Sequence, residues 1–451
     1  MSYLQDTFPP GLSNSKSDLE KDRMMNIKDL YNKFQESGKI STDTRQISAG
    51  SIFFALKGDK FNANTFALQA LEKGASYAVV DEKEYAVNDK CVLVDNVLDT
   101  LQQLARYHRD HLKIPIIGLT GSNGKTTSKE LLHSVLSKKY KTLATKGNLN
   151  NHIGVPLTLL AIDKSIEIAV VEMGANHVGE IALLCSIANP SHGFITNIGR
   201  AHIGMFGGFE NIIRAKSELY QHLIQNEGTV FINSQNEILA NMAKRFRQPI
   251  FYPEKGDYYH GELVSADPFV KVKAENGNEI QTKLIGAYNF ENIMSALCIG
   301  KYFGVQPNEA NAAIEQYEPG NMRSQMVKKG TNTIILDAYN ANPSSMQAAV
   351  ENLAAMNSTG KVAILGDMFE LEEEAEKEHR LIGQLLQYKK FDKVYLCGKL
   401  FKAALTEIPA AKYFEDKAAL IENLKMHPLS DSTILVKASR GIGLETIVEY
   451  L

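Results

Sequence analysis

The 451-residue sequence predicts an α/β protein built from three domains, and three observations support this fold class. Short apolar runs rich in β-branched residues alternate with helical segments along most of the chain. One of these runs leads through a glycine-rich loop into a helical segment, an order typical of nucleotide sites. The length also exceeds what one hydrophobic core usually organises, so we expect several domains.

The first predicted domain spans residues 24–113. It follows residues 1–23, which are rich in Ser, Asp, Lys and Pro and which we expect to form a disordered extension. Apolar runs and helical stretches alternate within the domain, and this pattern indicates a small α/β unit. The predicted strands are residues 51–56, 76–80 and 91–94, and the predicted helices include 65–73 and 97–111.

The second and third predicted domains, residues 114–318 and 319–451, repeat this alternation on a larger scale and are separated by the Glu-Pro-Gly break at 318–320. The central domain is expected to form a doubly wound, mostly parallel sheet, and the C-terminal domain a Rossmann-like sheet without a dinucleotide GxGxxG turn. The predicted strands are 114–120, 167–172, 193–197 and 228–233, then 333–336, 361–365, 393–397 and 432–436.

Composition and charge indicate which kinds of binding partner and which cellular compartment to expect. A formal net charge of −3 supplies no broad cationic field, so we expect small-molecule partners and no nucleic acid. The four cysteines are widely spaced, which favours reduced thiols over a zinc site or a disulfide framework. No apolar run approaches the roughly 18 residues needed to cross a bilayer, and the start lacks the features of a secretory signal. We therefore expect a cytoplasmic protein without membrane insertion. We also expect a monomer.

The glycine-rich loop predicts ATP binding. Residues 118–127, GLTGSNGKTT, follow an apolar run and open a helix, so backbone N–H groups can turn toward phosphates. The ammonium of Lys125 would reach the outer phosphates, and the hydroxyl of Thr126 would hold Mg²⁺. The usual first glycine of such loops would fall at Leu119, and a glycine-rich surface turn is the alternative interpretation. The predicted nucleotide-binding residues of the loop are Gly121, Asn123, Gly124, Lys125, Thr126 and Thr127.

Several polar residues elsewhere are candidates for chemistry. Glu172 ends a predicted strand at the edge where ligands of parallel sheets bind, which favours a magnesium ligand over a helix cap. His202 follows another strand and Lys216 lies on a helix, and taken alone each also fits a structural role. The acidic run 370–378 is interpreted as a solvated helix start rather than a metal site.

A series of motifs, in order and over nearly the whole chain, resembles the Mur ligases of peptidoglycan synthesis. Two of them, YNANP at 339–343 and LGDMFELE at 365–372, resemble the members that join D-alanyl-D-alanine to UDP-N-acetylmuramoyl-tripeptide. Gly204, where relatives often carry an acid, and Tyr288, in place of a frequent histidine, depart from the pattern. The motifs are TGSNGKTT, KGNLNNHIGVPLTLL, VVEMGAN, TNIGRAH, RAKSEL, GAYNFENIMSA, GNMRSQ, LDAYNANPSSM, LGDMFELE and LVKASRG.

The resemblance implies an N-terminal domain for the UDP end of the substrate, a central ATP-binding domain and a C-terminal domain that closes over the nucleotide. It implies two magnesium ions, held by Thr126, Glu172 and His202, with Lys216 as a carbamylated lysine. Adding CO₂ to a neutral lysine amine would convert it into an anion with oxygen donors for a hard cation. The catalytic residues implied in this way are Lys125, His202, Lys216 and Arg323.

Further contacts are implied by the same resemblance. Asn289 and Asn292 would lie beside adenine, and Arg323 would meet the γ-phosphate. Asp337, Tyr339 and Asn340 would face the nucleotide, although an Asn-Pro turn explains this segment equally well. The implied substrate-binding residues are Ser41, Thr44, Arg45, Asn148, Asn150, Asn151, Asn342, Lys437, Ser439 and Arg440.

The implied reaction is an ATP-dependent ligation through an acyl phosphate, which the incoming dipeptide amine then captures. The alternatives are a sister Mur ligase that adds the third stem residue and a folylpolyglutamate synthetase-like ligase, and the YNANP segment disfavours both. A nucleotide switch that hydrolyses ATP only to change shape is an alternative of a different class.

Overall fold

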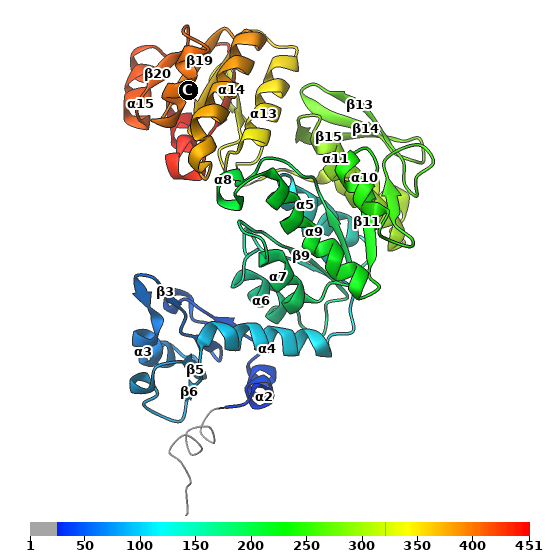
Figure 1. Ribbon diagram of the computed structural model, residues 1–451, viewed down its shortest axis with the longest axis vertical. Coiled ribbons are helices and arrows are strands. Elements are labelled where there is room, and N and C mark those ends of the chain that lie inside the picture. The colour runs from blue at the N-terminus through cyan, green and yellow to red at the C-terminus, as the bar shows by residue number, and fades with distance from the viewer. Residues whose placement is uncertain (1–24, 321) are drawn as a thin grey trace, which may run out of the picture. The chain divides into compact units, whose positions relative to one another are not determined.

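The computed structural model describes residues 25–320 and 322–451, so the predicted disordered extension lies outside the described residues. The chain divides into two compact units (Figure 1). Among the described residues, one unit contains residues 25–112 together with Leu159–Asp163, and the other contains Lys113–Thr158 and the described part of Lys164–Leu451. The described residues form mixed α/β structure, as predicted, while the exact domain boundaries at 113 and 318 stay predictions.

The first unit is built on a parallel sheet with strand order β1-β2-β5-β6. All three predicted strands are present, and helix α4 matches its predicted span because Asn96 caps its first turn and Leu101, Leu104 and Ala105 form a buried stripe. The elements are α2 (Ile27–Ser37), β1 (Ile40–Ser41), β2 (Ile52–Phe54), β3 (Lys57–Gly58), β4 (Phe61–Asn62), α3 (Ala67–Glu72), β5 (Tyr77–Val80), β6 (Cys91–Leu93) and α4 (Val97–His111).

The second unit begins with a six-stranded parallel sheet of order β12-β11-β10-β7-β9-β8. Every residue of β7 and β9 is buried, because helices cover a parallel sheet on both faces. The elements are β7 (Ile116–Thr120), α5 (Lys125–Leu136), β8 (Thr142–Ala144), α6 (Gly154–Leu160), β9 (Ile168–Glu172), α7 (Glu180–Ala188), β10 (His192–Ile195), α8 (Ile203–Phe206), α9 (Phe209–Gln225), β11 (Thr229–Asn233), α10 (Glu237–Ala243) and β12 (Ile250–Tyr252).

The central β7 has β9 on one side and β10 on the other. Leu119 pairs with Glu172 and with Phe194, so the carboxyl ends of the three strands lie together. The strand order reverses at β7, since the chain continues on one side of it and then on the other. In open α/β sheets, ligands bind at the carboxyl edge beside such a reversal, so this edge is the expected ligand site.

An antiparallel sheet that the sequence reasoning did not predict follows the parallel sheet, and two helices complete the region. Helix α5 is anchored against α11, where a Cβ on Gly300 would lie only 2.5 Å from Cγ1 of Val135. The helix that carries the phosphate loop is thus held at close range by α11. The elements are β13 (Glu262–Ala266), β14 (Phe269–Lys273), β15 (Glu279–Ile285), α11 (Asn289–Tyr302) and α12 (Pro307–Gln316).

The C-terminal sheet has strand order β16-β17-β21-β18-β19-β20, in which only β16 runs antiparallel to its neighbour. This is the predicted Rossmann-like sheet with one added edge strand. The elements are β16 (Gln325–Lys329), β17 (Asn332–Leu336), α13 (Pro343–Ala355), β18 (Lys361–Gly366), α14 (Ala375–Lys389), β19 (Lys393–Cys397), β20 (Lys412–Phe414), α15 (Lys417–Met426) and β21 (Thr433–Lys437).

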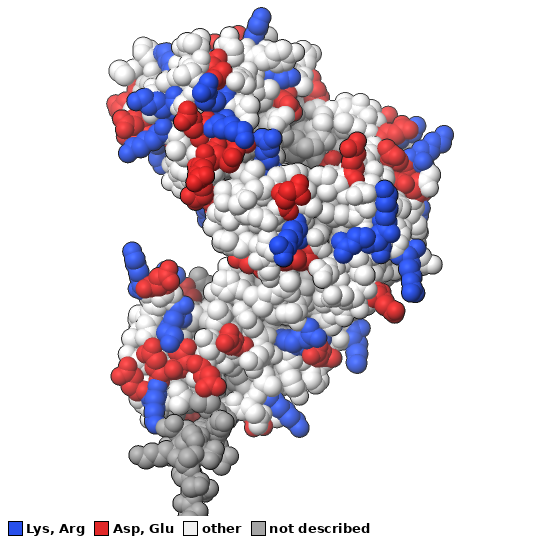
Figure 2. Space-filling view, in the orientation of Figure 1, with Lys and Arg blue, Asp and Glu red and all other residues white. Residues whose placement is uncertain are grey.

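The charged surface agrees with the low net charge. Figure 2 shows acidic and basic side chains interspersed over the visible face, without a broad basic patch. No helix within residues 25–320 and 322–451 is both long and apolar enough to cross a membrane.

We predict that Leu131→Ala, in the buried face of α5, lowers the free energy of unfolding by about 2–5 kcal/mol through the cavity it leaves. Urea denaturation measures the loss. Val178→Ala is the matched control in the same unit, and we expect it to change stability by no more than about 0.5 kcal/mol because Val178 is partly exposed. Equal losses in the two variants would contradict the assigned core.

Candidate active site

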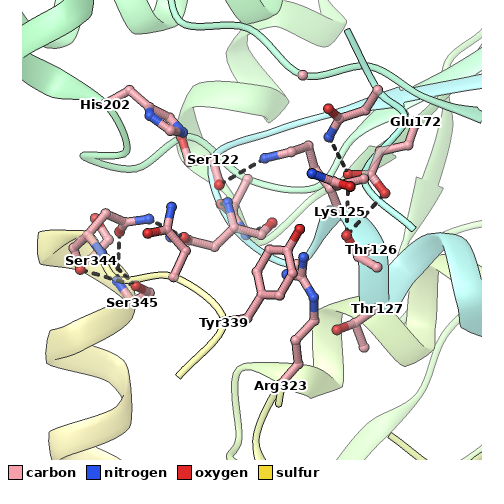
Figure 3. A pocket seen from close by; sticks show the side chains of 18 of the residues that line it. Ser122, Lys125, Thr126, Thr127, Glu172, His202, Arg323, Tyr339, Ser344 and Ser345 are labelled. Carbon is pink, nitrogen blue, oxygen red and sulfur yellow. Dashed lines mark hydrogen bonds between the residues drawn. The ribbon is translucent and has the colours of Figure 1, made fainter. Parts of the chain in front are cut away.

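A cavity of about 690 Å³ lies between the central and C-terminal domains, beside the phosphate loop (Figure 3). Its polar lining comes from both domains. The predicted site residues that line it are Asn123, Gly124, Lys125, Thr126, Thr127, Asn148, Asn150, Asn151, Glu172, His202, Asn289, Asn292, Arg323, Asp337, Tyr339, Asn340, Asn342 and Lys437.

The phosphate loop requires its glycines because other chain segments approach it closely. A Cβ on Gly121 would lie 2.0 Å from the hydroxyl of Thr196, and one on Gly124 would lie 2.5 Å from Oδ1 of Asn292. Gly124 also has φ 77°, which disfavours any residue with a side chain. The two glycines are therefore required because Thr196 and Asn292 leave no space for a side chain at these positions.

Lys125 occupies the interior of this loop. Its ammonium donates hydrogen bonds to the carbonyl oxygens of Gly121 (2.7 Å) and Ser122 (3.1 Å), as Figure 3 shows in part. Burial lowers the pKa of the Lys125 ammonium, and the nearby Glu172 carboxylate opposes that shift. An anionic phosphate in the loop would add a second opposing charge, so nucleotide binding favours the charged form.

Glu172 is the carboxylate at the centre of the site. Its oxygens accept hydrogen bonds from the Thr126 hydroxyl (3.1 Å) and the Asn150 amide (2.8 Å), and Nζ of Lys129 lies 3.5 Å away. The side chain is 2% exposed. A hydroxyl and a carboxylate in contact at a phosphate loop are the oxygen donors that Mg²⁺ takes together with nucleotide phosphates. Within the described ranges, no three His, Cys, Asp or Glu side chains form a metal cluster.

Lys216 lies on α9 behind the cavity wall rather than in its lining. Its side chain is buried, and its Nζ lies 3.4 Å from the carbonyl oxygen of Ala175, a lining residue, and 5.3 Å from the centre of the Phe206 ring. Burial, with a smaller contribution from the positive charge of Lys125, lowers the pKa of the Lys216 ammonium to about 7. A substantial fraction of the amine is therefore neutral near neutral pH, as reaction with CO₂ requires.

The segment after β10 connects the phosphate loop to the C-terminal domain. Ser122 exchanges hydrogen bonds of 2.8 Å with the backbone N–H and C=O of Gly199. At the next residue, the same segment contacts the C-terminal domain: the backbone N–H of Arg200 donates to the hydroxyl of Ser344 at 2.8 Å. Asn342 of that domain also donates to the side chain of Asn123 at 2.8 Å. The same segment is therefore hydrogen-bonded both to the phosphate loop and to the C-terminal domain.

Two acidic residues of the C-terminal domain contact the same segment. Glu378, only 3% exposed, pairs with Arg200 at 2.9 Å, and the carboxylate of Glu370 contacts Nδ1 of His202. The interaction with His202 lowers the pKa of the Glu370 carboxyl group. The interpretation of residues 370–378 as a solvated helix start is therefore wrong for Glu378, which is buried against a basic partner far away in the sequence, whereas Glu370 is exposed and also contacts His202.

Gly204 accounts for the close approach of the acidic segment. A Cβ at this position would lie 2.5 Å from the carbonyl carbon of Leu371 and 2.7 Å from Cγ of Glu372. The departure from the family pattern at residue 204 thus coincides with a backbone contact that only glycine allows.

The C-terminal domain presents cations to the cavity. The guanidinium of Arg323 stacks on the ring of Tyr339 at 3.8 Å, and this contact fixes the plane of the guanidinium. Lys437 is buried, with its ammonium 2.5 Å from the carboxylate of Asp337 and 3.3 Å from the carbonyl of Asn340. Figure 3 shows Arg323 and Tyr339 opposite the phosphate loop.

Asn289 and Asn292 are fixed by a chain of hydrogen bonds at the start of α11. Ser128 donates to Asn292 at 2.9 Å, Asn292 donates to Asn289 at 2.8 Å, and Asn289 donates to the carbonyl of Ile285 at 2.8 Å. Both asparagines line the cavity while holding α11 against the phosphate-loop helix, so contacts within the protein fix their position.

Some predicted residues do not line the cavity. Gly121 and Lys216 lie behind its wall, Arg440 lies 5.3 Å from the Tyr339 ring, and the hydroxyl of Ser439 is used within its own domain by the backbone of Phe369. The three predicted UDP-binding residues belong to the other compact unit, where exposed Arg45 pairs with Asp43 and holds the pKa of that carboxyl at about 2. These three are Ser41, Thr44 and Arg45.

Sequence reasoning missed several residues of the site. Lys129 gave one usable signal, its position one helical turn after Lys125. Ser344 gave none, because its contact with residue 200 joins positions 144 apart in the sequence. Further lining residues without an assigned role are Ser122, Asn176, Glu180, Asn197, Tyr288 and Glu291.

A phosphate loop at the carboxyl edge of a parallel sheet, facing cations from a second α/β domain, is the arrangement of an enzyme that uses a nucleoside triphosphate. Comparison with known proteins identifies which one. Three family models match: "Mur ligase family, catalytic domain" at residues 38–109, "Mur ligase middle domain" at 119–300 and "Mur ligase, glutamate ligase domain" at 322–440. The chain belongs to the Mur ligase family, and the resemblance seen in the sequence motifs is confirmed.

Named relatives and solved structures cover nearly the whole chain. The UDP-N-acetylmuramoyl-tripeptide–D-alanyl-D-alanine ligase of Bacillus subtilis is 36% identical over 91% of this chain and 92% of its own length. The enzyme of the same name from Escherichia coli is 32% identical over 91% and 93%. A crystal structure of MurF from Acinetobacter baumannii has a TM-score of 0.82 at 32% identity, covering 91% of this chain and 92% of that chain.

A second solved structure carries a nucleotide. The MurF ligase of Thermotoga maritima in complex with ADP has a TM-score of 0.79 at 26% identity, covering 92% of this chain and 97% of that chain. The predicted three-domain fold and the use of ATP are confirmed by these comparisons.

We predict that Glu378→Gln loosens the contact between the C-terminal domain and the segment after β10. Losing a charge-assisted hydrogen bond to a partly exposed arginine should cost about 1.5 kcal/mol, or roughly a tenfold rise in amide exchange at residues 199–206. Mass-spectrometric hydrogen exchange measures this rise. The control is Glu376→Gln on the same helix, whose side chain is 76% exposed. Equal exchange in the two variants would show that the ion pair does not hold the segment.

Proposed function

We propose that this chain joins D-alanyl-D-alanine to UDP-N-acetylmuramoyl-tripeptide in peptidoglycan synthesis, with hydrolysis of ATP to ADP and phosphate. The observation that carries the proposal is one cavity in which Lys125 of the phosphate loop faces Arg323 of the C-terminal domain. The relatives at 32–36% identity bear the name of this activity.

The chemistry begins with attack of the tripeptide carboxylate on the γ-phosphorus of ATP. A P–O bond to ADP breaks, and an acyl phosphate forms. The amine of the dipeptide then attacks the acyl carbon, inorganic phosphate leaves, and the amine gives up a proton as the amide forms. Lys125 and Arg323 lower the barrier of the first step because they neutralise charge on the phosphoryl oxygens. Closure of the C-terminal domain over the nucleotide, which the family resemblance implies, would limit the access of water to the acyl phosphate.

The residues present fit the magnesium ions that the family implies. The Thr126 hydroxyl and the Glu172 carboxylate would hold one ion, which when bound spreads the negative charge of the phosphates. His202, which lines the cavity and contacts Glu370, would help to hold a second ion. Lys216, as a carbamate, would supply oxygen donors from behind Ala175.

The substrate contacts extend this proposal. Asn148, Asn150 and Asn151 would bind the muramoyl peptide, and Asn342 and Lys437 the incoming dipeptide or the peptide carboxylate. Ser41, Thr44 and Arg45 would bind the UDP end, with Ser439 and Arg440 supporting the C-terminal contacts. We also propose a cytoplasmic monomer that binds no nucleic acid.

The alternative ligases are less well supported. The structure of a ligase that uses 2,6-diaminopimelate is 16% identical with a TM-score of 0.52, and a folylpolyglutamate synthase is 15% identical with a TM-score of 0.59. These likenesses concern the fold alone. The relatives named for D-alanyl-D-alanine addition, at twice that identity, favour the proposed dipeptide substrate.

The proposed reaction predicts that ADP release requires both the UDP-muramoyl tripeptide and D-alanyl-D-alanine. With a tripeptide labelled with ¹⁸O at its carboxylate, we expect one heavy oxygen in the released phosphate, measured by mass spectrometry. Parallel assays with lysine-type and diaminopimelate-type tripeptides would identify the accepted stem peptide. An equal rate of ATP hydrolysis with and without the tripeptide and the dipeptide would instead indicate a nucleotide switch.

We predict that Lys216→Ala lowers the rate of ligation by a factor on the order of 100 or more, because the site loses an anionic ligand that cannot be replaced by the remaining side chains. Added short carboxylates should restore part of the rate. ¹³C-bicarbonate labelling of the wild type should give a carbamate carbon signal that the variant lacks. Full activity in the variant without additives would remove Lys216 from the mechanism.

A further inference from the structure

Lys129 is a buried cation to which the proposed mechanism gives no role. Its side chain is 3% exposed, and it lies on α5 one turn after Lys125. Burying an ammonium is costly unless it is paired and hydrogen-bonded, so its partners indicate why it is there.

The two partners of Lys129 belong to separate parts of the cavity wall. Its Nζ lies 3.5 Å from Oε2 of Glu172, at the end of β9, and donates a hydrogen bond of 3.1 Å to the carbonyl of Gly147. Gly147 opens a loop, residues 147–151, whose asparagines line the cavity. One ammonium therefore joins the carboxylate of the predicted metal site to the loop beside it.

The same loop returns to Glu172 through a second contact. The amide of Asn150 donates to the other carboxylate oxygen, Oε1, at 2.8 Å, and the carbonyl of Asn150 accepts from the backbone N–H of Gly174 at 2.7 Å. The two segments pack closely at this point, since a Cβ on Gly174 would lie 2.9 Å from the side chain of Asn150. Lys129 and Asn150 thus hold the two oxygens of one carboxylate and both ends of one short loop.

We propose that Lys129 is a positioning residue for the ligation: its ammonium holds the Glu172 carboxylate and the 147–151 loop in one arrangement, so that the metal–nucleotide site and the adjacent substrate loop form together. This inference rests on the proposed function. Lys129 touches neither nucleotide nor peptide in this role and acts through Glu172 and Gly147.

The sign of the effect on cation binding separates positioning from simple electrostatics. A positive charge 3.5 Å from a ligand carboxylate repels a divalent cation, so by Coulomb's law alone its removal would tighten cation binding. If Lys129 instead holds the carboxylate in place, its removal leaves a buried carboxylate with fewer donors and weakens cation binding.

The test compares Lys129→Met and Lys129→Gln with the wild type and with Lys164→Met, an exposed lysine of the same unit, as control. The affinity for Mn²⁺ in the presence of ADP is measured by electron paramagnetic resonance, and amide exchange at residues 147–151 is measured without ligands. We expect Mn²⁺ binding to weaken at least tenfold and exchange to rise at least tenfold in both Lys129 variants. Lys129→Arg, which keeps the charge, should restore part of the Mn²⁺ affinity.

Other outcomes overturn the inference. Unchanged or tighter Mn²⁺ binding in a folded Lys129 variant would show that the ammonium does not position Glu172. A lower melting temperature with unaltered Mn²⁺ affinity and exchange would leave only a structural role. Failure of the proposed function would look different, because the wild type would then release no extra ADP when the tripeptide and D-alanyl-D-alanine are added, whether or not the Lys129 variants bind Mn²⁺ more weakly.

Discussion

One buried carboxylate, that of Glu172, brings the parts of this active site together. It ends the strand beside the phosphate-loop strand, and its donors come from the loop helix and from the 147–151 loop. A buried anion with good hydrogen-bond donors tolerates little displacement, because each lost donor leaves its desolvation uncompensated. The elements that supply Thr126, Lys129 and Asn150 are therefore constrained relative to β9.

A second constraint extends this order to the C-terminal domain. Residues 196–204 bind the phosphate loop through Thr196, Asn197 and Gly199 and bind the C-terminal domain through Arg200 and His202. These contacts form a continuous physical path between the loop that would hold ATP and the domain that carries Arg323. Such a path connects the two elements by position, and exchange measurements on the 199–206 segment test whether it also couples them energetically.

The sequence was informative where the chemistry is local. The phosphate loop and Glu172 could be predicted because an apolar run, its glycines and its strand-end acid are adjacent in the chain. The antiparallel sheet was missed although β14 and β15 alternate buried and exposed residues, which is a usable strand signal; only its outer strand β13 is largely exposed and lacks one. Glu378 was interpreted as solvated because its arginine partner is 178 residues away, and Lys129 was not singled out because most helical lysines are solvated. Burial by distant segments decided these cases, and no local pattern records it.

The contact at Gly204 has a consequence for how this chain can vary. Because even a methyl group there would overlap the backbone of Leu371, a larger residue requires the acidic segment to move outward. That segment also carries Glu370, so its displacement would separate this carboxylate from His202. Residue 204 and residues 370–372 are therefore expected to change together during divergence, and a substitution acceptable in one lineage would be harmful when transplanted alone into another.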